Sequence, residues 1–213
     1  MSLRDGRGFA EYSKPLMDFL GSLAHEEQVI LVGHSFGGLS LALTMDKLPN
    51  EVSLAVFVAA FMPDVSSKPA HVINEVKIKI MEAFYVILYR TLSSPTIKDP
   101  INPTSILFGP ELLASNLYQN CPMEVTNKTM LVRVGSLFQE ELTNSPAFSR
   151  EGYGLVNRAY IICGEDKTIP KVYQNWMVEN YPVKQVKEIG GADHMAMMSK
   201  PRELFDLLLD IAH

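Results

Sequence analysis

Apolar runs alternate with amphipathic segments along this chain, and the alternation predicts an α/β protein. Four runs are typical of strands, the first three apolar enough for burial on both faces of a sheet: 29–33 (VILVG), 54–62 (LAVFVAAFM), 159–165 (AYIICGE) and 185–191 (QVKEIGG). Apolar residues at helical spacing predict helices over 9–24, 39–48, 170–180 and 201–213. The first two strands are joined by a helix through short connections, so they should run parallel with a right-handed crossover. We therefore expect at least four parallel strands flanked by helices.

Residues 64–155 follow a different pattern, which predicts a helical cap over the sheet. A helical stretch covers 71–92, a proline-punctuated segment follows it, and further helical pieces are predicted at 110–118 and 121–128. The sequence shows no internal repeat and no low-complexity linker. We therefore interpret residues 1–213 as a single domain with 64–155 as an insertion.

The composition narrows the classes of function. The chain has 213 residues, 47% of them hydrophobic, and a net charge of -5, so it lacks the basic surface that binds nucleic acid. Its longest nearly uncharged apolar run, AFYVILY at 83–89, is too short to cross a bilayer, and the N-terminal MSLRDGRGF lacks the apolar stretch of a secretory signal. Cys121 and Cys163 lack metal-ligand spacing, and we interpret them as free thiols of a cytoplasmic protein.

The stretch VILVGHSFGG places a serine between glycines at the end of a strand. Gly33-x-Ser35-x-Gly37 between a buried strand and a helix is the pattern of a nucleophile elbow. A serine there adopts a strained backbone conformation that points its hydroxyl out of the sheet, and glycines on either side avoid Cβ clashes. The backbone N–H of Phe36 can then bind a developing oxyanion. The alternative interpretation is a turn with a capping serine.

A serine hydroxyl is a poor nucleophile near neutral pH, so it needs a base, usually a histidine held by an acid. His194 lies in a loop just after the fourth predicted strand, and sites in open parallel sheets form at the carboxyl ends of strands. It is therefore the candidate base. His34 precedes the serine, and its ring should point away from the hydroxyl. The remaining histidines lie in a polar surface segment, in the cap and at the end of the chain: His25, His71 and His213.

The acid should lie between the serine and the histidine in chain order. Asp166, just past the third predicted strand, is the favoured residue, and its neighbour Glu165 should point the other way. Asp64, after the second strand, is the alternative, and Asp193 is expected to face solvent. The non-catalytic interpretation of Asp166 is a helix N-cap.

Five stretches together resemble the plant methylesterase family of the α/β-hydrolase superfamily: GHSFGG, AVFVAAFMPD, LFGPELLASNLYQNCP, YIICGEDKTIP and GGADHMAM. The family includes polyneuridine aldehyde esterase and the salicylate and jasmonate methyl-ester hydrolases of plant hormone metabolism. The resemblance implies an α/β-hydrolase fold with Ser35 as nucleophile, Asp166 as acid and His194 as base. Related hydroxynitrile lyases carry a glutamate before the serine and a lysine after the histidine, where this chain has His34 and Met195. We expect these two residues to contact the substrate, and their identities favour ester hydrolysis.

The sequence departs from the family pattern in two places. Family members begin with a strand and an HG-rich, tryptophan-containing loop that supplies a second oxyanion donor, and residues 1–28 contain nothing similar. We therefore expect the N-terminal strands to be absent and strand 29–33 to form a sheet edge that self-pairs, as a homodimer or an aggregate. Loss of one oxyanion donor typically costs about 10²–10³ in rate. The segment 71–92 is more apolar than expected and lacks a tryptophan, whereas Trp176 follows Asp166.

The expected activity is hydrolysis of a small carboxylic methyl ester through an acyl-enzyme. The pocket should be largely apolar and roofed by the cap, and the reaction needs no metal or organic cofactor. The expected partner is this small-molecule substrate, with no nucleic acid and no membrane. The main alternative is a catalytically impaired, shortened homologue that binds a small apolar ligand or a partner chain. Hydroxynitrile lyase activity is a third, less favoured hypothesis.

Overall fold

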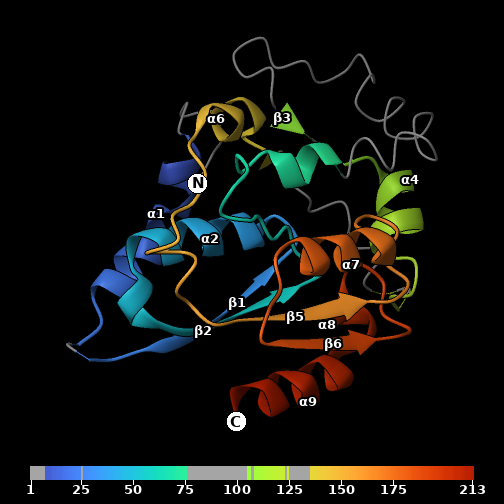
Figure 1. Cartoon of the computed structure of the whole chain (residues 1–213). Coiled ribbons are helices and arrows are strands. Elements are labelled where there is room, and N and C mark those ends of the chain that lie inside the picture. The colour runs from blue at the N-terminus through green and yellow to red at the C-terminus, as the bar shows by residue number, and fades with distance from the viewer. Residues whose placement is uncertain (1–7, 25, 76–104, 107, 123, 125–134) are drawn as a thin grey trace.

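The computed structural model describes residues 8–24, 26–75, 105–106, 108–122, 124 and 135–213. Its central feature is a sheet of four strands: β1 (Val29–His34), β2 (Val52–Val58), β5 (Arg158–Cys163) and β6 (Gln185–Ile189). Neighbouring strands are all parallel, in the spatial order β1-β2-β5-β6 (Figure 1). The predicted α/β fold with four parallel strands is therefore confirmed.

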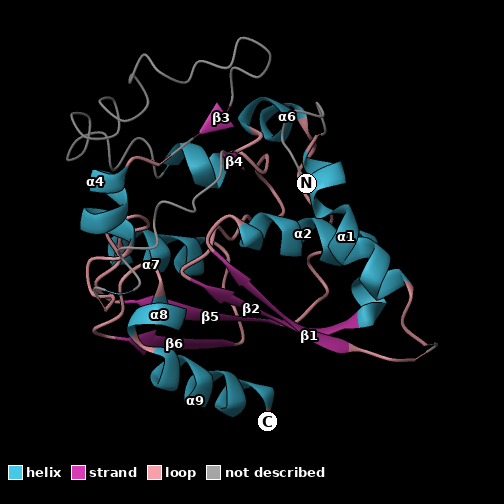
Figure 2. Ribbon diagram, turned by 180° about the vertical axis from the view of Figure 1, so that it is seen from behind, coloured by secondary structure: helices cyan, strands magenta, loops and turns pink. Residues whose placement is uncertain are grey.

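Helices cover both faces of this sheet, as Figures 1 and 2 show from opposite sides. One layer holds α1 (Phe9–Gly21), α2 (Gly37–Lys47) and α7 (Lys171–Asn180), and the other holds α8 (Ala196–Ser199) and α9 (Pro201–Ala212). Alternate strand residues point to opposite layers. Phe57 and Tyr160 belong to the core cluster beneath the first layer, whereas Val56 and Ile161 belong to the cluster beneath α9. The continuous apolar runs of β2 and β5 thus reflect burial on both faces.

β1 differs from the prediction that it is buried on both faces. Leu31 is buried, but Ile30 and Val32 are 40% and 50% exposed. The reason is position: β1 is the outermost of the described strands on its side, and α9 packs chiefly on β6 at the opposite edge. The predicted sheet edge is therefore confirmed within the described sheet. Self-association through that edge stays a prediction.

The predicted ends of β2 and β5 lie beyond the observed ones. β2 ends at Val58 rather than at residue 62, because Ala59 takes a positive φ of 41° and turns the chain. β5 ends at Cys163, and the next two backbone N–H groups bond to the carbonyls of Ile189, the last residue of β6, and of Ala192 in the loop after β6. Because β2 and β5 are parallel, the loops that follow them both begin at the carboxyl-terminal end of the sheet.

The segment between β2 and β5 is described in part. It contains helical residues 71–75, α4 (Pro110–Leu112), the π-helical turn η3 (Leu113–Leu117), the antiparallel pair β3 (Ser105–Ile106) and β4 (Gly135–Ser136), and α6 (Gln139–Asn144). In Figure 1, α4, β3 and α6 lie on the side of the sheet that carries α2 and α7. The helix predicted over 110–118 is observed as α4 and η3, while 76–92 and most of 121–128 lie outside the described residues. The division into a domain and a cap at 64–155 stays a prediction.

A 3₁₀ turn, η2 (Pro49–Glu51), joins α2 to β2, which makes the connection as short as the sequence predicts. No helix in the described part of the chain is long and apolar enough to cross a membrane.

Candidate active site

A sharp turn between β1 and α2 holds the serine that the sequence predicts as nucleophile. Ser35 has a positive φ of 55°, which is a strained conformation for a residue with a Cβ. A Cβ on Gly33 would lie 2.6 Å from the side chain of Leu41, so this glycine allows α2 to approach β1 closely. A Cβ on Gly37 would meet nothing within 4 Å, whereas one on Gly38 would clash with backbone. The second close contact therefore belongs to Gly38 rather than to Gly37.

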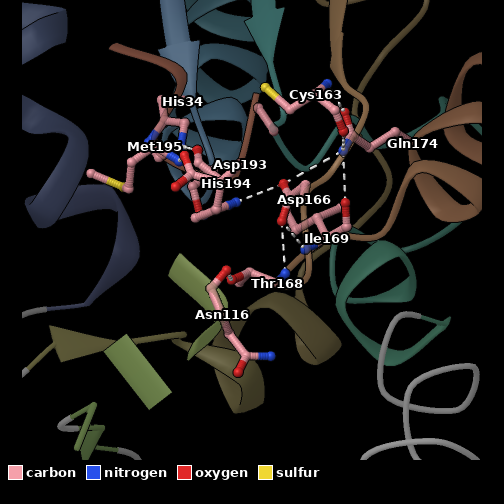
Figure 3. A network of polar contacts seen from close by, with 12 residues as sticks. His34, Asn116, Cys163, Asp166, Thr168, Ile169, Gln174, Asp193, His194 and Met195 are labelled. Carbon is pink, nitrogen blue, oxygen red and sulfur yellow. Dashed lines mark hydrogen bonds and ion pairs between the residues drawn. The ribbon is translucent and has the colours of Figure 1, made fainter. Parts of the chain in front are cut away.

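Three predicted residues meet at the carboxyl ends of the strands. The hydroxyl oxygen of Ser35 lies 2.9 Å from Nε2 of His194, and Nδ1 of His194 lies 2.8 Å from Oδ2 of Asp166. The side chains of His194 and Asp166 are 2% and 0% exposed, and Figure 3 shows the imidazole pointing to the carboxylate. With a proton on Nδ1 donated to Asp166, Nε2 is free to accept the hydroxyl proton of Ser35. The arrangement can deprotonate a serine.

The two oxygens of Asp166 have different partners. Oδ1 accepts backbone N–H bonds from Thr168 at 2.7 Å and Ile169 at 2.9 Å, which leaves Oδ2 directed at His194. The amide of Gln174 donates to the carbonyl of Ile169 at 2.7 Å and lies 3.5 Å from Oδ2 of Asp166. Gln174 is fully buried on α7, and sequence reasoning missed it. Its one signal in the sequence was a polar residue within the predicted helix 170–180. In the structure this helix packs against β5.

Comparisons with known proteins identify the family of this chain. The sequence matches the model of the Alpha/beta hydrolase family over residues 3–207. It is 42% identical over 214 residues to Methylesterase 3 of Arabidopsis thaliana, covering 100% of this chain and 80% of that protein. It is 45% identical over 204 residues to Alpha-hydroxynitrile lyase of Arabidopsis thaliana, covering 95% and 77%. The crystal structure of polyneuridine aldehyde esterase matches with a TM-score of 0.89 at 41% identity, covering 99% of this chain and 82% of that one. The chain belongs to the plant methylesterase family of the α/β-hydrolase superfamily.

In this methylesterase-family chain the other candidate acids lie elsewhere. Oδ1 of Asp64 accepts bonds from Ser66 and Ser67, and Oδ2 accepts one from Asn180 at 2.9 Å. Asp64 was the alternative because strand 54–62 was expected to end beside it; since β2 ends at Val58, Asp64 lies well along the following loop. Glu165 is exposed, as expected. Among the described residues, the side chains of Asp64 and Glu165 therefore form their hydrogen bonds with residues other than His194.

Asp193 does not face solvent, so that expectation is wrong. Its side chain is fully buried, and it accepts hydrogen bonds from Met195, Asn120 and Cys121. A carboxylate in a loop is usually exposed, but the turn after η3 covers Asp193. Cys121 and Cys163 are free thiols.

His34, the residue before the serine, contacts His194. Its Nε2 lies 2.7 Å from the carbonyl oxygen of His194, and the two imidazole rings are 4.6 Å apart. Burial, and then the neighbouring His194, lower the pKa of His34 to about 4, so the ring is neutral near pH 7. Since a carbonyl can only accept, Nε2 of His34 carries the proton and donates it. That the ring points away from the Ser35 hydroxyl and that it contacts the substrate both stay predictions.

Met195 follows the histidine and joins a separate apolar cluster. Its side chain packs against a cluster of buried leucines of α4 and η3, and two aromatic residues pack against the same cluster: Leu112, Leu113 and Leu117, with Phe108 and Tyr118. The side chain is partly exposed. A substrate contact by Met195 stays a prediction that this apolar surrounding favours.

Phe36 occupies the first position after the serine, where α2 begins. Within the described residues, no backbone oxygen accepts a hydrogen bond from its N–H. Its ring packs edge-on against Phe9 at 5.8 Å and lies 6.1 Å from Phe138, so the turn is anchored to α1 and to the start of α6. Of the remaining histidines, His71 lies against Trp176, and His25 lies outside the described residues.

Replacing Asp64 with asparagine should change how the free energy of unfolding depends on pH. Burial alone would raise the pKa of Asp64, but hydrogen bonds from Ser66 and Ser67 outweigh it and lower the pKa from 3.8 to about 2. A lowered folded-state pKa means that this carboxylate stabilises the fold above pH ~4 and that the contribution is lost as the pH falls towards 2. We expect Asp64→Asn to lower the free energy of unfolding at pH 7 by about 1–2 kcal/mol. Its stability should also fall less steeply than that of the wild type between pH 4 and 2.5.

Urea unfolding followed by circular dichroism at pH 7, 4 and 2.5 measures both effects. Parallel pH dependences for the two proteins would contradict the assignment of this acid-sensitive contribution to Asp64.

Proposed function

We propose that this protein is a carboxylic ester hydrolase that uses Ser35 as nucleophile, His194 as base and Asp166 as acid. The observation that carries the proposal is the continuous chain of contacts from Ser35 through His194 to Asp166, at 2.9 and 2.8 Å, in a buried site. Relatives named methylesterase and esterase support ester hydrolysis as the reaction class.

The geometry supports a two-step reaction. As Ser35 Oγ attacks the ester carbonyl, the O–H proton moves to Nε2 of His194, and Asp166 stabilises the resulting imidazolium. The backbone N–H of Phe36 binds the oxyanion. Collapse of the tetrahedral intermediate breaks the bond to the alkoxy oxygen, which receives the proton from His194 and leaves as an alcohol. Water, deprotonated by His194, then attacks the acyl-enzyme; collapse of the second tetrahedral intermediate breaks its bond to Ser35 Oγ, which takes the proton back from His194, and the acid is released.

The proposed substrate is a small methyl ester, so the alcohol is methanol. Met195 and the apolar cluster of α4 and η3 beside it favour an uncharged, apolar acyl group. Methyl esters of aromatic and aliphatic acids are therefore the first compounds to compare.

Cyanohydrin cleavage is the second candidate, because a relative of 45% identity is named a hydroxynitrile lyase. Overall identity therefore does not separate the two reactions. As noted for the sequence, related hydroxynitrile lyases carry a glutamate and a lysine at the positions of His34 and Met195. Without that lysine, a departing cyanide anion has no cationic partner from position 195, which favours ester hydrolysis.

Intact-mass labelling with a fluorophosphonate tests the proposal on the wild type and on Ser35→Ala. We expect one adduct on the wild type and none on the variant, because the reagent reports an activated serine without requiring the true substrate. A folded wild type that takes no adduct would contradict the hydrolase and favour the ligand-binding homologue. A wild type that takes the label, and whose unlabelled form releases cyanide from a cyanohydrin without hydrolysing any ester, would favour the lyase.

A further inference from the structure

A second buried carboxylate lies one residue from His194, and the triad does not use it. Asp193 is fully buried between the loop after β6 and the turn after η3. Its Oδ1 accepts the backbone N–H of Met195 at 3.0 Å. Its Oδ2 accepts the backbone N–H of Asn120 at 2.9 Å and the thiol of Cys121 at 3.3 Å. Both oxygens act as acceptors, an arrangement that suits the ionised group.

The thiol partner is held in its donating form. Burial, and then the hydrogen bond to Asp193, raise the pKa of Cys121 to about 12, so its sulfur keeps the proton near neutral pH. The adjoining Asn120 also reaches the loop after β5, where its amide donates to Glu165 at 2.6 Å. The turn at 120–121 therefore contacts the two loops that carry the base and the acid.

The contacts of Asp193 fix the backbone on both sides of the catalytic imidazole. The Met195 N–H bonds back to Asp193 two residues earlier, which closes a tight turn with His194 at its centre. From the other side, the neutral ring of His34 donates to the His194 carbonyl at 2.7 Å. The imidazole can then keep its 2.9 Å and 2.8 Å contacts only while this peptide segment stays in place.

We propose that Asp193 is a positioning residue, which fastens the His194 loop to the turn at Asn120 and Cys121 and holds the imidazole between Ser35 and Asp166. The inference rests on the proposed function of the triad. In this proposal the turn at Asn120 and Cys121, which follows η3, supports the reaction by holding the His194 loop in place. Its side chains take no direct part in the chemistry.

The charge of Asp193 gives this role a measurable signature. Among the described residues, the titratable groups that face His194 or the carboxylates beside it are Asp166, Glu165, Asp193, His34, Cys121, Tyr118, Tyr160 and Cys163. Replacing Asp193 with asparagine removes one negative charge beside the imidazolium while the other groups stay. The imidazolium is then less stabilised, so the acid limb of the rate profile should move to lower pH.

The rate constant for fluorophosphonate labelling of Ser35, measured from pH 5 to 9, tests the proposal. In Asp193→Asn one amide oxygen can still accept from Met195, but the amide N–H₂ now faces the Asn120 N–H, donor against donor. We expect labelling at pH 7.5 to slow by about 10–100-fold, because a small displacement of the base disrupts its alignment with the serine. The midpoint of the acid limb should also fall.

Asp64→Asn is the matched control, because Asp64 is another buried carboxylate in a tight turn whose partners lie outside the triad loops. It should lose stability without moving the midpoint. An Asp193→Asn variant that folds, labels at the wild-type rate and keeps the wild-type midpoint would overturn the inference. A wild type that takes no label would instead overturn the proposed function, so the two failures are distinguishable.

A pair of variants at Cys121 covers the case in which Asp193→Asn does not fold. Cys121→Ser keeps a hydrogen-bond donor to Asp193, and Cys121→Ala removes it. We expect the alanine variant to label several-fold more slowly than the serine variant. Equal rates and equal pH profiles for this pair would overturn the inference.

Discussion

Asp166→Asn is expected to slow fluorophosphonate labelling of Ser35 by about 10⁴-fold while leaving the fold intact. The reason lies in the divided roles of the two carboxylate oxygens. Oδ1 accepts the backbone N–H groups of Thr168 and Ile169, so in the variant the amide oxygen must occupy that place. The amide N–H₂ then faces Nδ1 of His194, which has to accept instead of donate. The proton moves to Nε2, and the imidazole can no longer take a proton from Ser35.

Glu165→Gln is the control for this experiment. It removes the same charge from the adjacent residue, but Glu165 is exposed and contacts Asn120 rather than the imidazole. Its labelling rate should stay within about threefold of the wild type, because exposed charges interact weakly through water. Near-wild-type labelling of Asp166→Asn would contradict its assignment as the acid. Circular dichroism and a thermal melt on the same samples separate loss of reactivity from loss of fold.

The sequence was most informative where one local pattern determined one local structure. The three apolar runs and QVKEIGG predicted the four strands. The order serine, aspartate, histidine along the chain placed these three residues together at the carboxyl ends of the strands. A parallel sheet explains why this works: the loops after β1, β5 and β6 must emerge on the same side. Residues 130 to 160 positions apart in the chain could therefore be matched without knowing the order of the strands.

The sequence was least informative about the direction of individual side chains in loops and at edges. Asp193 is buried because the turn at Asn120 covers it, a long-range contact that no local pattern contains. Ile30 and Val32 are as apolar as the residues of β2, but their exposure depends on where α9 packs. The contacts of Gln174 likewise depend on the loop that carries Asp166, because its amide donates to the carbonyl of Ile169 in that loop. Each of these features is set by packing between distant segments, whereas hydrophobic periodicity reports only which residues prefer burial.

The glycines of the elbow give the second large prediction, which concerns stability. A Cβ on Gly38 would lie 2.2 Å from the carbonyl oxygen of Phe61 and 3.0 Å from the Cβ of Ala60. Both obstacles belong to the chain just after β2, and the Phe61 N–H donates to the Ser35 carbonyl at 3.0 Å, so neither can move without displacing the serine. We expect Gly38→Ala to lower the free energy of unfolding by about 3 kcal/mol, which is roughly 6–12 °C in Tm for a domain of this size.

Gly37→Ala is the matched variant, one residue earlier on the same helix. A Cβ on Gly37 would meet nothing within 4 Å, and Gly37 lies in α2 without a positive φ. Alanine also restricts the unfolded chain, so this variant should be as stable as the wild type or more stable by about 0.5 kcal/mol. Thermal and urea unfolding of the two variants side by side measure the difference. Equal losses from both substitutions would show that the elbow requires two glycines for their backbone freedom. A loss confined to Gly38→Ala would show that the requirement is the close approach of α2 to the chain after β2, the contact that fixes Ser35 in its strained conformation.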